Sequence, residues 1–149
     1  MVNKRILPPT YLLISILVML GLGLLFPITS VIPPFWNLFG LLPLASGILL
    51  NLRADRAFHQ AHTTVKPFDQ SSALVTEGVY QLSRNPMYLG FVLILLGIAI
   101  LLRSLLPYLA VAIFAFFIDR VFIRVEEKMM ADRFGDQWEA YRKKIRRWI

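Results

Sequence analysis

Three long apolar blocks alternate with polar segments along the chain: Tyr11–Phe26, Phe35–Leu52 and Leu89–Ile118. An uncharged stretch extends the first block to Ile32. As a single helix the third block would measure about 45 Å, whereas the hydrocarbon core of a bilayer is about 30 Å thick. Because Arg103-Ser104 interrupts this block, we expect two helices joined by a tight turn there. The pattern predicts an all-α polytopic membrane protein with about four transmembrane helices, the third of them short.

Composition supports the membrane class. Of the 149 residues, 57% are hydrophobic and only 17% are charged, so a soluble domain of this size could not bury the apolar surface. The net charge of +7 suits anionic lipid headgroups, whereas the hydrophobicity argues against a nucleic-acid partner. The chain has no cysteine, which excludes disulfides and thiol chemistry. We expect one membrane domain over residues 1–149, with its core motifs in 63–149.

The basic residues predict an orientation. Fifteen of the sixteen Lys and Arg residues fall on one side of the predicted membrane, and Arg103 alone falls on the other. The positive-inside rule then places both termini in the cytoplasm, and we expect the bacterial inner membrane. The apolar stretch after Lys4 and Arg5 lacks a small-residue cleavage site, so we expect a retained helix rather than a signal peptide.

The first cytoplasmic polar segment is the long loop between the second and third spans. It begins helically and then looks extended over Thr63–Phe68, since Pro67 disfavours helix at the residue before it. A short β-like piece follows over Leu74–Tyr80, broken at Gly78. A loop of this length, tied between two spans, is more often functional than idle.

The loop ends in a turn that begins the next helix. Asn85 is a good N-cap residue, and Pro86 loses no hydrogen bond at the first helical position. The backbone N–H groups of Met87, Tyr88 and Leu89 would then form an anion site, strengthened by Arg84 and the helix dipole. The alternative is a well-capped membrane helix with a snorkelling arginine.

The second polar segment follows the fourth span. At helical periodicity, Asp119, Glu126 and Glu127 lie near one face, and Arg120 and Arg124 form an adjacent pair. Ionisable residues at the edge of a span favour a functional site over a solvated helix end only when a second polar cluster lies opposite. The turn at Arg84–Tyr88 is such a cluster.

The chain then continues with apolar residues at spacings of four and three, and with basic residues between them. This pattern predicts an amphipathic basic helix lying in the membrane interface, with these apolar positions: Phe134, Trp138, Tyr141, Ile145 and Trp148.

Other chemistry finds little support. His59, His62 and Asp55 make a weak metal-ligand set, so we expect no metal. The chain has no P-loop, no dinucleotide G-x-G-x-x-G motif and no Ser/His/Asp triad pattern.

Three blocks together resemble the isoprenylcysteine carboxyl methyltransferase family and the related phospholipid methyltransferases. The blocks are Gly78-Val79-Tyr80 with Arg84–Gly90, then Glu126-Glu127, then Phe134–Tyr141. The resemblance runs from about Thr63 to the C-terminus. It implies a membrane enzyme that uses S-adenosyl-L-methionine as its cofactor.

Carried over residue by residue, the resemblance implies two groups of cofactor contacts. The cytoplasmic loop and the turn after it supply most of them: Ser72, Ala73, Leu74, Val75, Tyr80, Asn85, Pro86, Met87 and Tyr88. The second group is the glutamate pair, in which Glu126 matches the cofactor-binding carboxylate and Glu127 is a candidate base for an amine acceptor.

The chain departs from the family pattern at two positions. Asn85 stands where the eukaryotic enzymes have histidine, and Phe122 stands where the family has an arginine that lines the substrate tunnel. Arg120 and Arg124 are then the candidates to replace that arginine at the catalytic site.

The resemblance implies a lipophilic, lipidated or phospholipid-like substrate that meets the enzyme among membrane lipids. The methyl acceptor stays open between a carboxylate, an amine and a hydroxyl, and so does the oligomeric state. Two alternatives are an NADPH-dependent membrane reductase like the sterol reductases, and a non-enzymatic membrane scaffold protein.

Overall fold

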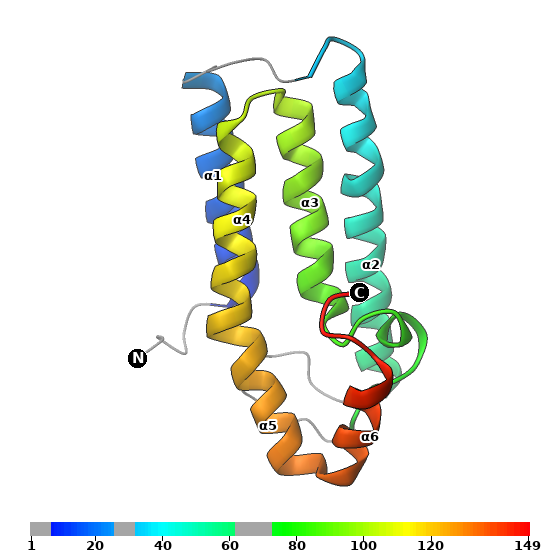
Figure 1. Ribbon diagram of the computed structural model, residues 1–149. Coiled ribbons are helices and arrows are strands. Elements are labelled where there is room, and N and C mark those ends of the chain that lie inside the picture. Colours follow the sequence, from blue (N-terminus) through cyan, green and yellow to red (C-terminus); the bar gives the residue numbers. More distant parts are fainter. Residues whose placement is uncertain (1–6, 26–31, 62–72) are drawn as a thin grey trace.

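The computed structural model describes residues 7–25, 32–61 and 73–149, and this part of the chain is helical throughout its regular structure. Figure 1 shows the elements in chain order. They are α1 (Pro8–Leu25), η1 (Trp36–Gly40), α2 (Leu41–Gln60), η2 (Gly78–Gln81), α3 (Pro86–Leu102), α4 (Leu106–Ile118), η3 (Asp119–Ile123), α5 (Arg124–Phe134) and α6 (Asp136–Lys144).

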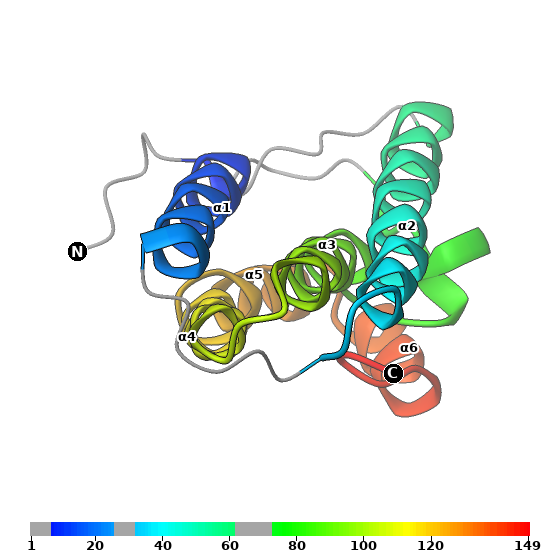
Figure 2. The same ribbon diagram turned by 90° about the horizontal axis from the view of Figure 1, so that it is seen from above.

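The four long helices lie side by side and alternate in direction (Figure 1). Helix α3 contacts α1, α2 and α4 and therefore occupies the middle of the bundle, as the view from above shows (Figure 2). Because of the alternation, the polar segment before α3 and the polar helices after α4 meet at the same end of the bundle. The predicted opposition of the two polar clusters is thus built into the topology.

Three helical stretches are long and apolar enough to cross a membrane: Pro8–Leu25, Trp36–Gln60 and Leu106–Phe134. Helix α3 is also apolar but has only 17 residues. The predicted break in the third apolar block is confirmed, since α3 ends at Leu102 and Arg103 adopts the left-handed conformation with φ of 60°. Many large apolar side chains of α1 and α2 are exposed, as expected for surfaces that face lipid.

Glycines control the approach of α2 to α3. A Cβ atom on Gly97 would lie 2.6 Å from the Gly40 carbonyl oxygen, and one on Gly47 would lie 2.5 Å from the Gly90 carbonyl oxygen. Both glycine pairs recur seven residues apart, which places them on one face of each antiparallel helix. In a bilayer the hydrophobic effect does not drive helices together, so they associate through close packing, which small residues at the contact permit.

The main core lies between α3 and α4 and continues into η3. Its fully buried members include Leu95, Ile118, Phe122 and Ile123, with Met19 of α1 packed against them. A second, smaller cluster joins the end of α2 to η2 and the start of α3. Tyr88 belongs to the first cluster and Tyr80 to the second.

Two predictions of local structure are wrong. Leu74–Tyr80 forms no strand: residues 74–76 are irregular and η2 begins at Gly78, whose φ of 60° favours glycine and ends the extended run. The C-terminal amphipathic helix is shorter than predicted, because Gly135 with φ of 48° separates Phe134 from α6 and Ile145 is extended. The predicted extended piece Thr63–Phe68 lies outside the described residues.

Replacing Gly97 with leucine tests the glycine contact. The side chain would push α2 away from α3, and overpacking of this kind costs about 1–3 kcal/mol. We expect the free energy of unfolding in detergent micelles to fall by at least that much. Gly21→Ala is the control, because nothing lies within 4 Å of a Cβ atom there. Equal stability of the two variants would contradict the packing described.

Candidate functional site

The site begins at the turn that starts α3. Pro86 is the first residue of the helix, as predicted, and both Asn85 and Pro86 are buried. Asn85 is the N-cap residue of α3, as predicted, but its side chain makes no capping hydrogen bond. Its Nδ2 donates instead to the carbonyl oxygen of Arg147 at 3.2 Å. The N–H of Leu89 is also not free, since it donates to the Asn85 carbonyl at 3.0 Å.

The second half of the site lies in the helical segment after α4. There α4 passes into α5 through one π-helical turn, η3. A π-turn adds a residue to the helical register and so rotates everything after it, and such turns often occur at functional sites. Glu126 and Glu127 follow immediately, in the first turn of α5. Because consecutive residues of an α-helix point about 100° apart, the two carboxylates face different partners, although the sequence pattern predicted one common face.

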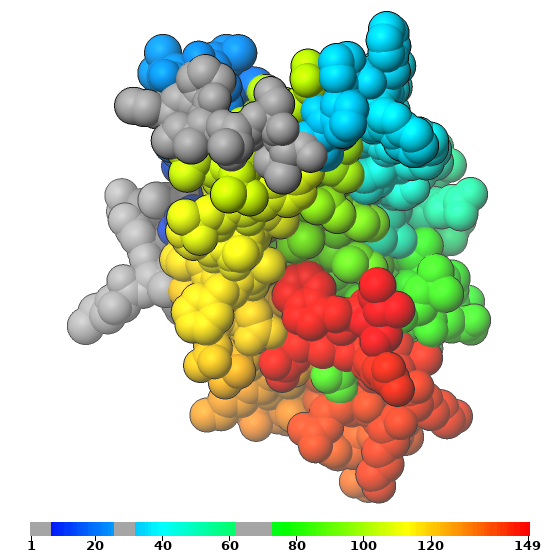
Figure 3. Space-filling view, turned by 45° about the horizontal axis from the view of Figure 1, so that its top comes forward, coloured from blue at the N-terminus to red at the C-terminus, as the bar shows by residue number. Residues whose placement is uncertain are grey.

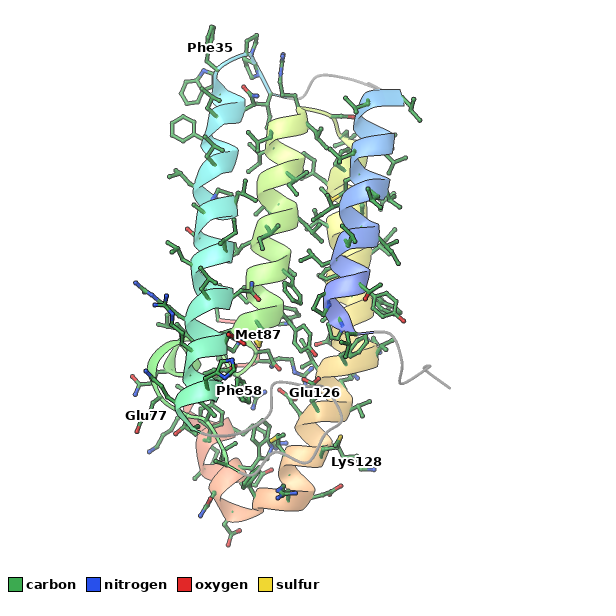
Figure 4. All side chains as sticks on the ribbon, turned by 180° about the vertical axis from the view of Figure 1, so that it is seen from behind. Phe35, Phe58, Glu77, Met87, Glu126 and Lys128 are labelled. Carbon is green, nitrogen blue, oxygen red and sulfur yellow. The ribbon has the colours of Figure 1, made fainter. Side chains whose placement is uncertain are left out.

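Glu126 faces the interior of the bundle. The Tyr88 hydroxyl donates to Glu126 Oε1 at 2.7 Å, and the Tyr88 ring is 7% exposed. The rings of Phe91 and Phe122 lie 6.2 and 6.4 Å from the Tyr88 ring. Figure 4 shows Glu126, Met87 and Phe58 at the same end of the bundle, on α5, α3 and α2. A carboxyl group thus lies beside an aromatic wall.

Glu127 is held by two arginines. Arg84 Nη2 lies 3.0 Å from Glu127 Oε1, and Arg147 Nη2 lies 2.6 Å from Glu127 Oε2. The side chains of Arg84 and Glu127 are only 8% and 11% exposed. Burial lowers the pKa of Arg84 while the nearby Glu127 opposes that shift, and hydrogen bonds from Arg147 to Glu127 raise the pKa of Arg147. We call Arg84, Tyr88, Glu126 and Glu127 the polar clamp.

The side of the site next to α2 is aromatic. Tyr80 packs edge-to-face on Phe58 with ring centres 5.5 Å apart, and Met87 joins the same cluster. The Tyr141 hydroxyl donates to the Tyr80 carbonyl at 2.7 Å. Burial raises the pKa of both tyrosines, that of Tyr141 to about 12, so both hydroxyls stay protonated at neutral pH.

The residues of the loop before α3 that the resemblance implies are placed in part. Ser72 lies outside the described residues, and Ala73 is the first residue after that gap. Leu74 and Val75 line a pocket of about 850 Å³ between α2 and η2, to which Arg53 and Arg56 also contribute. Val75 additionally packs against the cluster that contains Tyr80.

Arg120 and Arg124 do not point into the polar clamp. Arg124 Nε bonds Asp119 Oδ2 at 3.1 Å, and Arg120 lies over the Phe116 ring at 4.9 Å. Their side chains are about half exposed, at 53% and 49%. The structure therefore separates them from Tyr88 and Glu126, although the resemblance implied that they could replace a tunnel arginine.

Sequence reasoning missed three polar residues that hold the site together: Ser83, Tyr141 as a hydrogen-bond donor, and Arg147. It read Tyr141 as an apolar position and Arg147 as one more cation of a surface helix. The signal that could have revealed Arg147 is the surplus of acids just after the fourth span, since Asp119 and Glu127 both need a cation.

Among the described residues no three metal-ligating side chains gather, and His59 pairs only with Asp55 at 3.4 Å.

The fold and site define a class: a helical membrane protein with a buried polar site at one end of its bundle. Comparison with known proteins narrows this class. The sequence model described as "Phospholipid methyltransferase" matches residues 35–137, so the chain belongs to the phospholipid methyltransferase family.

Curated relatives agree with this family. The chain is 34% identical over 96 residues to the protein-S-isoprenylcysteine O-methyltransferase of Schizosaccharomyces pombe, covering 63% of this chain and 39% of the relative. It is 32% identical over 113 residues to protein-S-isoprenylcysteine O-methyltransferase B of Arabidopsis thaliana, covering 72% and 55%. A Haemophilus influenzae protein is 40% identical over 63 residues, covering 42% of this chain and 100% of that protein.

The chain thus spans about half or less of the length of these two methyltransferases. No solved structure shows a significant match.

Replacing Tyr141 with phenylalanine tests the aromatic side of the site. The change leaves the Tyr80 carbonyl without its hydroxyl donor, and an unsatisfied buried group costs about 1–3 kcal/mol. We expect the free energy of unfolding to fall by that amount. The control is Tyr108→Phe, which removes a hydroxyl that makes no hydrogen bond within the described part of the chain and should change stability by less than about 0.5 kcal/mol. A Tyr141→Phe protein as stable as the control would show that the bond is not formed.

Proposed function

We propose that this protein is an integral-membrane methyltransferase that takes its methyl group from S-adenosyl-L-methionine. The observation that carries the proposal is the contact between the two matched motifs: Tyr88 of the turn binds Glu126, and Arg84 binds Glu127. These motifs lie about forty residues apart in the sequence, and the family match spans both. A coincidental surface pair would not bury its carboxylates.

The residues present fit this cofactor. Glu126 Oε1 accepts from Tyr88, and within the described chain Oε2 has no hydrogen-bond partner, so Glu126 can accept from an ammonium or a ribose hydroxyl. Arg84 Nε is buried without a hydrogen-bond partner in the same part of the chain. That N–H and the start of α3 would receive the cofactor carboxylate. Tyr80 and Tyr88 offer aromatic faces to a cationic sulfonium.

When bound, S-adenosyl-L-methionine supplies an electrophilic methyl group. The task of the protein is then to align the acceptor and to exclude water, because a direct displacement needs orientation more than acid–base help. The buried wall of Tyr88, Phe91 and Phe122 provides the water-poor side of the site. Met87 and Tyr80 close the side next to α2.

The proposed roles of the remaining residues follow from their contacts. Leu74 and Val75, with Ala73 and Ser72 before them, would border the cofactor from the loop side. Glu127 is bonded at both oxygens by arginines, which favours a positioning role over that of a base. Arg120 and Arg124 lie near the bilayer surface, where they could attract an anionic substrate but not touch the polar clamp.

We further propose that α1, α2, α3 and α4 are four membrane spans, with the polar clamp on the cytoplasmic side. The single described cation at the opposite end, Arg103, donates to the carbonyl of Ile32, which lies shortly before η1, at 2.9 Å. Both termini and the basic helix α6 then lie in the cytoplasm. The acceptor would be lipophilic and would reach the site from the membrane.

Binding of S-adenosylhomocysteine to the purified protein, measured by isothermal titration calorimetry, tests the proposal. We expect saturable one-to-one binding. In Glu126→Gln a bond to a charged acceptor is lost, worth about 1.5–3 kcal/mol, so the Kd should rise by about tenfold or more. Tyr88→Phe should weaken binding less.

Glu139→Gln is the matched control, because it removes one acid whose pairing with Arg142 at 3.4 Å lies on the surface. Its Kd should stay within about twofold of the parent protein. Absence of binding to the folded parent protein would refute the proposed function. Incubating membranes with labelled methyl donor and identifying the labelled lipid or peptide would then define the acceptor.

A further inference from the structure

The last five residues, Ile145–Ile149, leave α6 and return across the start of α3. Helix α6 ends at Lys144, and Ile145 is extended with φ of −115° and ψ of 133°. Trp148 packs against the core cluster formed by α3, α4 and η3. Figure 3 shows this C-terminal segment, in red, lying against α4 and α3. The segment is thus bound to the bundle rather than free.

Backbone groups of this segment bind the turn before α3. The N–H of Arg84 donates to the Arg146 carbonyl at 3.0 Å. The Arg147 carbonyl accepts from Ser83 Oγ at 3.1 Å and from Asn85 Nδ2 at 3.2 Å. Ser83 is fully buried and also accepts from the Asn85 N–H at 3.1 Å. The buried polar groups of the turn therefore depend on the C-terminal segment for partners.

The Arg147 side chain points the other way, to the acids after α4. Its Nε donates to Glu127 Oε1 at 3.2 Å and its Nη2 donates to Glu127 Oε2 at 2.6 Å, a bidentate geometry. Its Nη1 binds Asp119 Oδ1 at 3.2 Å. Arg147 therefore joins the turn at the start of α3 to the π-turn and to α5. One half of the polar clamp, Arg84 and Tyr88, lies at that turn, and the other half, Glu126 and Glu127, lies on α5.

We propose that Arg147 is a positioning residue that fixes the distance between the two halves of the polar clamp. The inference rests on the proposed function, since the clamp is the proposed cofactor site. Arg84 also binds Glu127, but only at Oε1, and it does not contact Asp119. Without the Arg147 guanidinium, Asp119 and Glu127 lose their shared cation, and α5 can move relative to α3.

Two variants of equal charge test the proposal. Arg147→Gln removes the bridge, whereas Arg146→Gln removes a neighbouring exposed cation with no ion pair among the described residues. A misplacement of the groups that position a substrate by about 1 Å can lower the reaction rate on the order of a hundredfold. We expect Arg147→Gln to raise the Kd for S-adenosylhomocysteine between about tenfold and a hundredfold, and Arg146→Gln to change it by less than about twofold. Arg147→Lys keeps the charge but not the fork and should be intermediate.

A distance measurement separates positioning from loss of fold. The chain has no cysteine, so Gln81→Cys and Lys128→Cys, both exposed, can carry two spin labels on either side of the clamp. Pulsed electron resonance should give a narrow distance distribution in the parent protein and in Arg146→Gln, and a broad one in Arg147→Gln. If Arg147→Gln does not fold, the same comparison is made with Arg147→Lys.

The outcomes are distinguishable. An unchanged distance distribution and unchanged affinity in the Arg147 variant would overturn the positioning role. Failure of the folded parent protein to bind S-adenosylhomocysteine would overturn the proposed function instead, while the spin-label widths would still test whether Arg147 fixes the two halves.

Discussion

The polar end of this protein depends on one carboxylate, that of Glu127, which is only 11% exposed and is held between Arg84 and Arg147. A buried charge is tolerated only when it is paired and hydrogen-bonded, and removing one partner of such a pair costs about 3–5 kcal/mol. The three residues come from the loop before α3, from α5 and from the C-terminal segment. Their pairing therefore forces three parts of the chain, far apart in sequence, into one place.

Helix α3 connects this constraint to the membrane-embedded bundle. One of its faces carries Gly90 and Gly97 and accepts the backbone of α2 at close range. Another carries Phe91 and Leu95 and packs into the core shared with α4. Its first turn carries Tyr88, the partner of Glu126. A shift of α3 would thus disturb the core and the polar clamp together, which explains how lipid-facing packing can position a site at the bundle's end.

Much of the fold could be predicted from the sequence. Apolar length identified the helices, and the interruption at Arg103 located the turn after α3 because a charged residue and a nearby proline rarely continue a lipid-facing helix. The contact between the Arg84–Tyr88 turn and the glutamate pair could also be predicted, because the charge pattern assigned both segments to the same side of the membrane. The glycines of α2 and α3 were available as a signal, through their common spacing of seven, and were not used.

The remaining errors have a physical cause. Periodicity treats a helix as uniform, so it could not foresee the π-turn of η3, which rotates both glutamates relative to α4. Glu126 then contacts Tyr88, and Glu127 contacts the arginines. Local propensity likewise favoured a capping hydrogen bond from the Asn85 side chain, whereas its Nδ2 donates to the Arg147 carbonyl, 62 residues away. The same long-range contact ends α6 early, since Ile145–Ile149 must reach the turn. Only tertiary structure decides between such partners.

Photo-crosslinking of the purified protein with labelled S-adenosyl-L-methionine, followed by peptide mapping, tests the central claim most directly. The account predicts that label appears in the peptides that contain residues 84–90 and 119–127, and that excess S-adenosylhomocysteine suppresses it. Label confined to α1 or to the first half of α2, or labelling that the competitor does not reduce, would contradict the account.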